Sequence, residues 1–168
     1  VIDRLARLPG VNRVSNGGLG ALGTIQVRGL PARYVGVRIN GIDVSDPSGT
    51  QNQFNFGGLT AAGVARVELL KGSQSALFGS EAIAGVVNIT TFEPEELGFS
   101  GKAQTEAGSY GTYSGALSLG YKSELGHVAL SYGRITSDGI SSQSFNTEED
   151  AFVQTTVNLS GAYQVADT

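Results

Sequence analysis

The sequence predicts a chain in two parts: an α+β segment over residues 1–92, followed by antiparallel strands of a transmembrane β-barrel over residues 93–168. Short apolar runs separated by glycine-rich loops fill the first part. The second part contains runs in which apolar residues alternate with small or polar ones, the pattern of barrel strands. The change falls at FEPEEL (92–97), a short acidic junction that contains a proline.

Composition narrows the classes of function. A chain of 168 residues is long enough for a domain with a sizeable core. The absence of cysteine excludes a disulfide framework and a cysteine-ligated metal site. A net charge of −4 argues against nucleic-acid binding, which needs a basic surface. No apolar run approaches the roughly 20 residues of a membrane helix. Because the chain opens on a helical pattern without an initiator Met, we expect a piece of a longer protein.

The first part begins with a short helix and two strands. The apolar residues of the segment 1–8 recur on one side of a helix that Pro9-Gly10 ends. A glycine-rich loop follows, and the alternating runs TIQVRG (24–29) and YVGVRIN (34–40) predict strands. The Asn40-Gly41 pair predicts a two-residue hairpin turn after the second strand.

Two further strands are predicted after a polar, glycine-containing loop at residues 45–58. They are RVELLK (66–71) and AGVVNITT (84–91), both bounded by glycine and serine. The stretch between them contains the helical turn SALFG (75–79). We interpret this stretch as a tight crossover that links two central strands.

Four alternating runs predict the barrel strands, at residues 99–107, 113–121, 128–132 and 153–165. A soluble β-sandwich also has alternating strands. Two details favour the barrel, because the second face is small and polar rather than heavily charged, and the runs exceed the usual strand length. The connection at 137–151 is long and acidic, whereas the earlier ones are short. Since a single-chain barrel needs at least about eight strands, we expect the N-terminal fragment of a larger barrel.

Motifs for catalysis or phosphate binding are weak. GLGALG (18–23) has the G-x-G-x-x-G spacing, but a β-rich run follows it in place of the required helix. A phosphate-binding P-loop needs its lysine after the second glycine, whereas Lys71 precedes Gly72. The one histidine, His127, lacks the partners of a triad or metal site. The sequence therefore predicts no enzyme, and a soluble nucleotide-binding domain is the alternative of another class.

Four blocks of the first part resemble the plug domain of TonB-dependent outer-membrane receptors. They are LARLPGV (5–11), IQVRG (25–29), VGVRINGIDVSDP (35–47) and VARVELLKGSQSALFGSEAIAGVVNITT (64–91). The last block is the most specific because its matches are many and in order: Arg66, Glu68, Gly72, Ser75, Leu77, Gly79, Ser80, Ala82, Gly85, Val86, Asn88, Ile89 and Thr91. Ser73, Phe78, Lys71 and Ala84 stand where the family has proline, tyrosine, arginine and a first glycine.

This resemblance implies an α+β plug domain over residues 1–92 and the first four strands of a barrel of about 22 strands over residues 93–168. It implies active uptake of a scarce, large nutrient across the outer membrane of a Gram-negative bacterium. An energy-transducing TonB complex would pull a segment upstream of Val1, and the barrel would face membrane lipid. No cofactor is required for such uptake.

The vitamin B12 receptor branch is the most similar in spacing, which makes cobalamin the first candidate nutrient. A siderophore or haem receptor of the same architecture is the alternative, and a non-transporting structural barrel is a third. By the resemblance, the plug contacts its substrate in apical loops, at Leu22, Thr24, Gly49 and Thr50.

The same resemblance implies a candidate calcium site in the acidic loop at residues 137–152. In this branch an acid-x-Asp-Gly-Phe motif binds calcium, and the corresponding residues here read EEDAF (148–152). Glu148 and Asp150 then take the ligand positions, with carboxylate oxygens of the kind that calcium prefers.

Overall fold

The computed structural model describes residues 1–46, 48, 52–139 and 151–165. The chain forms two compact units. Unit 1 contains Val1–Leu59 and Arg66–Thr90, and unit 2 contains Thr60–Ala65 and Thr91–Thr168. Within the described residues, no helix is long and apolar enough to cross a membrane.

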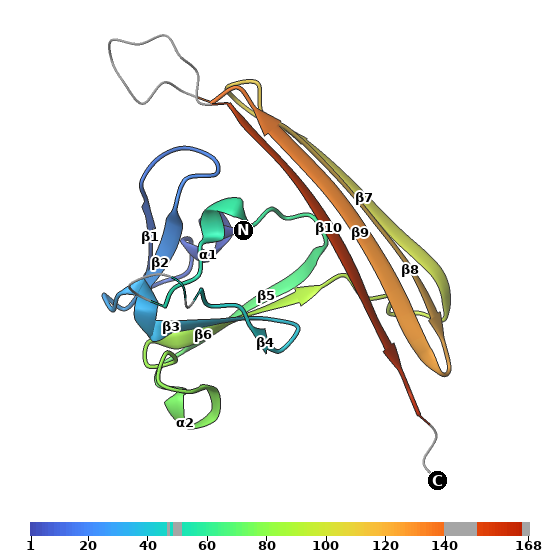
Figure 1. Cartoon of the computed structure of the whole chain (residues 1–168), viewed down its shortest axis with the longest axis horizontal. Coiled ribbons are helices and arrows are strands. Elements are labelled where there is room, and N and C mark those ends of the chain that lie inside the picture. The colour runs from blue at the N-terminus through green and yellow to red at the C-terminus, as the bar shows by residue number, and fades with distance from the viewer. Residues whose placement is uncertain (47, 49–51, 140–150, 166–168) are drawn as a thin grey trace. The chain divides into compact units, whose positions relative to one another are not determined.

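Unit 1 is built from short helices and strands (Figure 1). In chain order these are α1 (Ile2–Leu5), β1 (Val11–Ser15), β2 (Gly23–Val27), η1 (Ala32–Tyr34), β3 (Val35–Ile39), β4 (Ile42–Asp43), η2 (Phe56–Gly58), β5 (Val64–Lys71), α2 (Ser75–Phe78) and β6 (Gly85–Thr91). β1 and β2 form a hairpin, and a second sheet has the strand order β4-β3-β6-β5.

The core of unit 1 lies around β2, β3 and β6. β3 and β6 are parallel neighbours in register from Val35–Gly85 to Ile39–Ile89. A strand with neighbours on both sides tends to lose its polar alternation, and β6 accordingly carries Val86 and Val87 in succession, both fully buried. Apolar burial of these β-branched side chains is the main favourable term that holds the sheet together.

Two features of this sheet depend on glycine: the turn between β3 and β4, and the close approach of β5 to β6. Asn40 and Gly41 both have positive φ, +50° and +81°, as a type I′ hairpin turn requires. The pairs Arg38–Asp43 and Ile39–Ile42 flank this turn, so the predicted two-residue hairpin is confirmed. Gly85 lies where a Cβ would collide with the carbonyl oxygen of Leu70, so the backbones of β5 and β6 approach too closely for a side chain.

Two expectations for unit 1 were wrong, and one strand was not predicted. The first helix ends at Leu5, and Leu8 is exposed instead of buried on the same side. Among the described residues, β5 is an edge strand and not a central one, since the sheet continues on its β6 side alone. Residues 11–15 form the strand that was not predicted, because only one of its side chains is fully buried and its local pattern is therefore weak.

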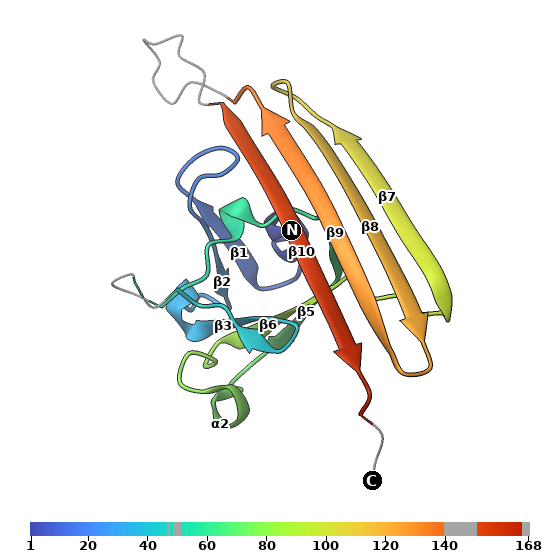
Figure 2. The same ribbon diagram turned by 45° about the vertical axis from the view of Figure 1, so that its right-hand side comes forward.

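Unit 2 contains one antiparallel sheet of four long strands in sequential order (Figure 2). The strands are β7 (Gly98–Ala107), β8 (Tyr113–Ser123), β9 (Gly126–Ser137) and β10 (Phe152–Tyr163). All four predicted alternating runs are strands, and β9 is longer than the predicted segment.

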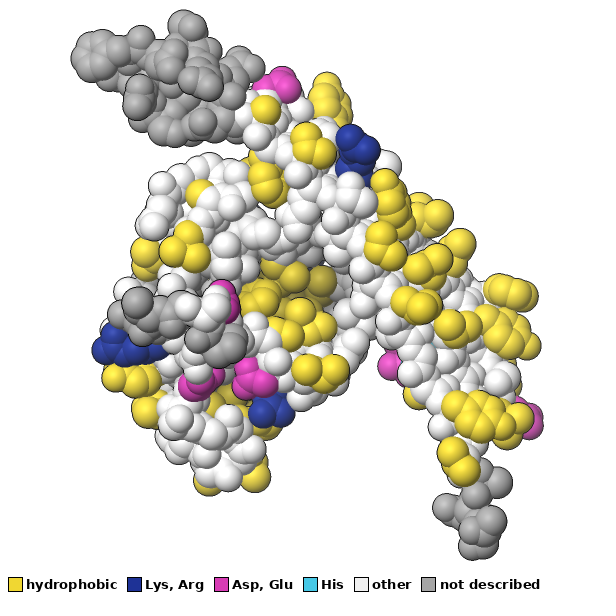
Figure 3. Space-filling model, in the orientation of Figure 1, with side chains coloured by type: hydrophobic (Ala, Val, Ile, Leu, Met, Phe, Trp, Pro, Cys, Tyr) yellow, Lys and Arg dark blue, Asp and Glu magenta, His cyan; other side chains and the backbone are white. Residues whose placement is uncertain are grey.

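Alternation gives this sheet two different faces. Register partners on one face, which we call the apolar face, form rows such as Leu119–Leu130–Leu159 and Leu117–Tyr132–Val157. These side chains are exposed, and hydrophobic atoms gather along the sheet in Figure 3. A sheet that shows large apolar side chains to its surroundings is typical of a barrel wall in lipid.

The opposite face, which we call the small-residue face, is packed against two chain segments of the same unit. Its central rows pair Ser118 with Ser131, Gly120 with Ala129 and Ala116 with Gly133. The buried Ser131 hydroxyl donates to the Ser118 hydroxyl at 2.8 Å, which satisfies both groups inside the contact. Small side chains leave room for backbone to approach this face.

The two packed segments are residues 60–65 and 92–94. A Cβ on Gly133 would collide with the Cβ of Ala62, and a Cβ on Gly120 would lie 3.1 Å from the Pro94 ring. The Phe92 amide donates to the Gly63 carbonyl oxygen at 2.7 Å, so the segments also bind each other. The lack of side-chain volume at Gly133 and Gly120 is therefore what allows this packing.

Replacing Gly133 by leucine should displace residues 60–65 from the sheet, because the new side chain occupies the space of Ala62. Overpacking of this kind costs about 2 kcal/mol, which corresponds to hydrogen exchange faster by more than tenfold over residues 60–65. Hydrogen exchange of the full-length protein, read by mass spectrometry, measures this. Gly115→Leu is the control, since a Cβ there meets nothing within 4 Å. Equal exchange in both variants would contradict the role of Gly133.

Candidate functional site

The tip of the β1–β2 hairpin carries two of the four predicted substrate residues. Its loop is closed by backbone hydrogen bonds from Asn16 to Leu22 (3.1 Å) and from Ala21 to Gly18 (3.3 Å). The glycine-rich sequence therefore forms a hairpin loop between two strands. No helix follows it, which confirms that GLGALG lacks the geometry of a dinucleotide site.

Leu22 and Thr24 share the outward side of this hairpin. Along β2 the buried positions are Gly23, Ile25 and Val27, so the residues between them point away from the core. Leu22 is 41% exposed and Thr24 is half-buried opposite Val14. The arrangement offers an exposed apolar side chain beside a hydroxyl, which suits contact with a large ligand that has both apolar and polar parts.

The other two predicted residues, Gly49 and Thr50, lie outside the described residues. The chain on either side of them is held by local hydrogen bonds. Asp46 and Gln53 form an isolated antiparallel bridge, with the Asp46 amide 3.4 Å from the Gln53 carbonyl oxygen. This bridge brings the two ends of the loop together.

The turn at Asp46 is stabilised by hydrogen bonds to the Asp46 carboxylate. The hydroxyl and the amide of Ser48 donate to Asp46 Oδ1 at 2.6 and 2.8 Å. These hydrogen bonds, that of the hydroxyl first, hold the pKa of Asp46 below its ordinary value of 3.8. Because the pKa is lowered in the folded state, the contribution to stability is complete above the ordinary value and is lost as the pH falls through the lowered one.

A contact that the sequence did not reveal joins this loop to the segment before β6. The Asn52 carboxamide donates to the Glu81 carboxylate, across 29 positions of sequence. No local pattern signals such a pair, since both residues lie in irregular segments. This hydrogen bond attaches Asn52, which follows the loop that contains Gly49 and Thr50, to the segment before β6.

The described residues contain no group of three or more His, Cys, Asp or Glu side chains that could hold a metal ion. Glu148 and Asp150, the predicted calcium ligands, lie outside the described residues. His127 lies in β9 with its side chain only 16% exposed, and its Nδ1 is 3.4 Å from Glu93 Oε1. The histidine thus has a carboxylate partner.

Lys71 has a structural role. Its ammonium group donates to the Pro9 carbonyl oxygen at 2.6 Å and so joins the end of β5 to the turn before β1. The prediction that the surrounding stretch is no phosphate-binding loop agrees with this geometry.

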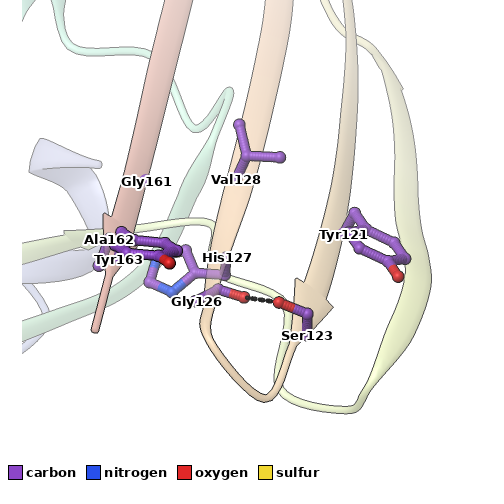
Figure 4. Close-up of a pocket in the computed structure, with 8 residues that line it drawn as sticks. All are labelled: Tyr121, Ser123, Gly126, His127, Val128, Gly161, Ala162 and Tyr163. Carbon is purple, nitrogen blue, oxygen red and sulfur yellow. Dashed lines mark hydrogen bonds between the residues drawn. The ribbon is translucent and has the colours of Figure 1, made fainter. Parts of the chain in front are cut away.

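A shallow depression of about 430 Å³ lies at one end of the sheet of unit 2 (Figure 4). Tyr121, Val128 and Tyr163 line it, together with Gly126 and Gly161. Apart from His127, its lining is apolar or hydroxylic and includes no carboxylate or amine, so the depression has no set of groups for catalysis.

Comparison with known proteins agrees with this picture. The family model described as the TonB-dependent Receptor Plug Domain matches residues 1–86. The chain is 33% identical over 175 residues to the vitamin B12 transporter BtuB of Photobacterium profundum, a match that covers 99% of this chain and 27% of that protein. The chain thus spans about a quarter of the length of this relative.

Solved structures share the fold. The ferric yersiniabactin uptake receptor FyuA from Yersinia pestis has a TM-score of 0.73 at 24% identity, over 97% of this chain and 26% of that one. A mutant of the ferric enterobactin receptor PfeA from Pseudomonas aeruginosa has a TM-score of 0.59 at 22% identity, over 82% of this chain and 22% of that one.

The chain belongs to the TonB-dependent receptor plug domain family. Its α+β plug is followed by antiparallel strands in the arrangement of the plugged barrel receptors, so the predicted fold class is confirmed. The family is one of receptors, not of enzymes, which agrees with the lack of catalytic motifs.

Proposed function

We propose that the full-length protein is an outer-membrane receptor for TonB-dependent uptake of a large, scarce nutrient, with cobalamin as the substrate. The observation that carries this proposal is the 33% identity to a vitamin B12 transporter over 99% of the chain. The structural neighbours named for ferric yersiniabactin and ferric enterobactin favour a siderophore as the second candidate.

In this proposal, loops of the plug bind the nutrient at the extracellular side. Leu22 supplies an exposed apolar contact, Thr24 a hydroxyl, and Gly49 and Thr50 a second set of contacts from the neighbouring loop. The apolar face of β7–β10 contacts membrane lipid, and further strands complete the barrel. Energy-transducing TonB pulls a segment upstream of Val1 and opens a path for the nutrient.

Cobalamin should bind to the purified full-length receptor and be taken up by cells that produce it in the presence of TonB. The measurement is uptake of radiolabelled cobalamin beside uptake of labelled ferric siderophores. A receptor that takes up an iron chelate and leaves cobalamin outside would overturn the cobalamin assignment in favour of the second candidate. Uptake of neither substrate by a correctly inserted protein would point to a non-transporting barrel.

Leu22→Asp in the full-length receptor should weaken cobalamin binding by about tenfold, because a charge replaces an apolar contact and must lose water on binding. Thr24→Val, which removes one hydroxyl at nearly constant volume, should cost less, roughly fivefold. Equilibrium dissociation constants in detergent measure both effects. Leu19→Asp is a matched control, since Leu19 is also exposed in the same loop and was not predicted to contact substrate. A loss in Leu19→Asp as large as in Leu22→Asp would refute the specific contact.

We also propose that Glu148 and Asp150 bind calcium in the loop at residues 137–152. Carboxylate oxygens are hard ligands of the type that calcium selects. The double substitution Glu148→Gln and Asp150→Asn should then abolish any dependence of cobalamin affinity on calcium. The check is a calcium titration of the dissociation constant in wild type and variant. A wild-type receptor whose affinity is the same with calcium and with chelator would remove this proposal and leave the uptake function intact.

A further inference from the structure

One side chain joins the β1–β2 hairpin, which carries the predicted substrate contacts Leu22 and Thr24, to the start of η2. The Oδ1 atom of Asn55 accepts hydrogen bonds from the amide of Gly23, at 3.0 Å, and from the amide of Gly57, at 2.9 Å. Gly23 lies between Leu22 and Thr24 in the β1–β2 hairpin. Asn55 itself belongs to the polar loop that begins after β4. A single acceptor therefore bonds to both segments at once.

The backbones of these segments also touch directly. A Cβ on Gly57 would collide with the carbonyl oxygen of Ala21. A Cβ on Gly23 would lie 3.2 Å from the Gly57 amide nitrogen and 3.2 Å from Cδ1 of Ile2. The two hydrogen bonds of Asn55 thus close a contact in which Gly57 has no room for a larger residue and Gly23 only a tight fit.

Asn55 is held in place by the residues around it. Phe56 is 3% exposed, and its ring meets that of Phe54 edge to face at a centroid distance of 4.8 Å. The amide of Leu59 donates to the Phe56 carbonyl oxygen at 3.1 Å and completes the turn of η2, for which Asn55 is the N-cap. The Asn55 carboxamide therefore extends from a fixed base, although the residue itself is exposed.

We propose that Asn55 is a positioning residue for substrate binding, which holds the β1–β2 hairpin, with Leu22 and Thr24, against the start of η2. This inference rests on the proposed uptake function. Loops that are already ordered bind with less loss of conformational freedom, so a receptor without this link has to order them on binding. Removal of the acceptor would also leave the Gly23 and Gly57 amides without their side-chain partner.

The test compares two substitutions at one position in the full-length receptor. Asn55→Ala removes the acceptor, whereas Asn55→Asp keeps an oxygen in the same place and is also a favoured N-cap. We expect the dissociation constant for cobalamin to rise about tenfold in Asn55→Ala and to stay within about twofold of wild type in Asn55→Asp. Asn12→Ala is the matched control, because Asn12 is an exposed asparagine on β1 of the same hairpin.

A second variant reaches the same contact from the other side. Gly57→Ala leaves Asn55 intact and places a methyl group against the Ala21 carbonyl oxygen, so it should also weaken binding. Wild-type affinity in Asn55→Ala or in Gly57→Ala would overturn the inference. So would an equal loss in Asn55→Asp and Asn55→Ala, because the acceptor would then not be the cause.

Hydrogen exchange of the free receptor separates this inference from the proposed function. Exchange over residues 21–24 should be faster in Asn55→Ala and unchanged in Asn55→Asp and Asn12→Ala. If wild type does not bind cobalamin, the proposed substrate fails, and faster exchange in Asn55→Ala alone still supports the link between the loops. Unchanged exchange in Asn55→Ala overturns the link whether or not cobalamin binds.

Discussion

Close approach of chain segments, at glycines that leave no room for a Cβ, holds the irregular parts of this chain in place. The same constraint recurs in both units: Gly57 lies against the carbonyl oxygen of Ala21, Gly85 against that of Leu70, and Gly133 against the Cβ of Ala62. At each point a segment without regular structure, or the edge of a sheet, meets another part of the chain directly. At these three positions glycine is therefore a requirement for packing. Hydrogen bonds such as those of Asn55 and of the Ser118–Ser131 pair then fix contacts that the glycines make possible.

The parts of the fold that the sequence predicted depend on near neighbours. β7–β10 are sequential antiparallel strands, so the alternation within each run and the short turns between most of them contain nearly all the information that the sheet needs. The Asn40-Gly41 turn is similar, since its positive φ angles follow from the residues themselves. The strand β6 was found from its β-branched run, although its parallel partner β3 lies far away in sequence.

Other features depend on contacts that the local sequence pattern does not show. β1 exists because it pairs with β2 from Val11–Val27 to Ser15–Gly23, while its own pattern shows little burial. The sequence marked the hairpin tip as a place for substrate contact, yet it could not show that Asn55 reaches the Gly23 amide. Asn is common in loops for local reasons, so its presence at residue 55 did not indicate a partner 32 positions away.

The sheet of unit 2 has a consequence for how such a chain is made. β7 and β10, of 10 and 12 residues, each have a neighbouring strand on one side within the described sheet. Long, regular outer strands with apolar side chains are templates for pairing with any other extended chain. Pairing of β7 or β10 with another copy of the chain would use the same backbone groups that a further strand of the sheet would use. Aggregation and correct growth of this sheet therefore compete for the same two edges, so the order in which strands pair matters as much as the strength of each pairing.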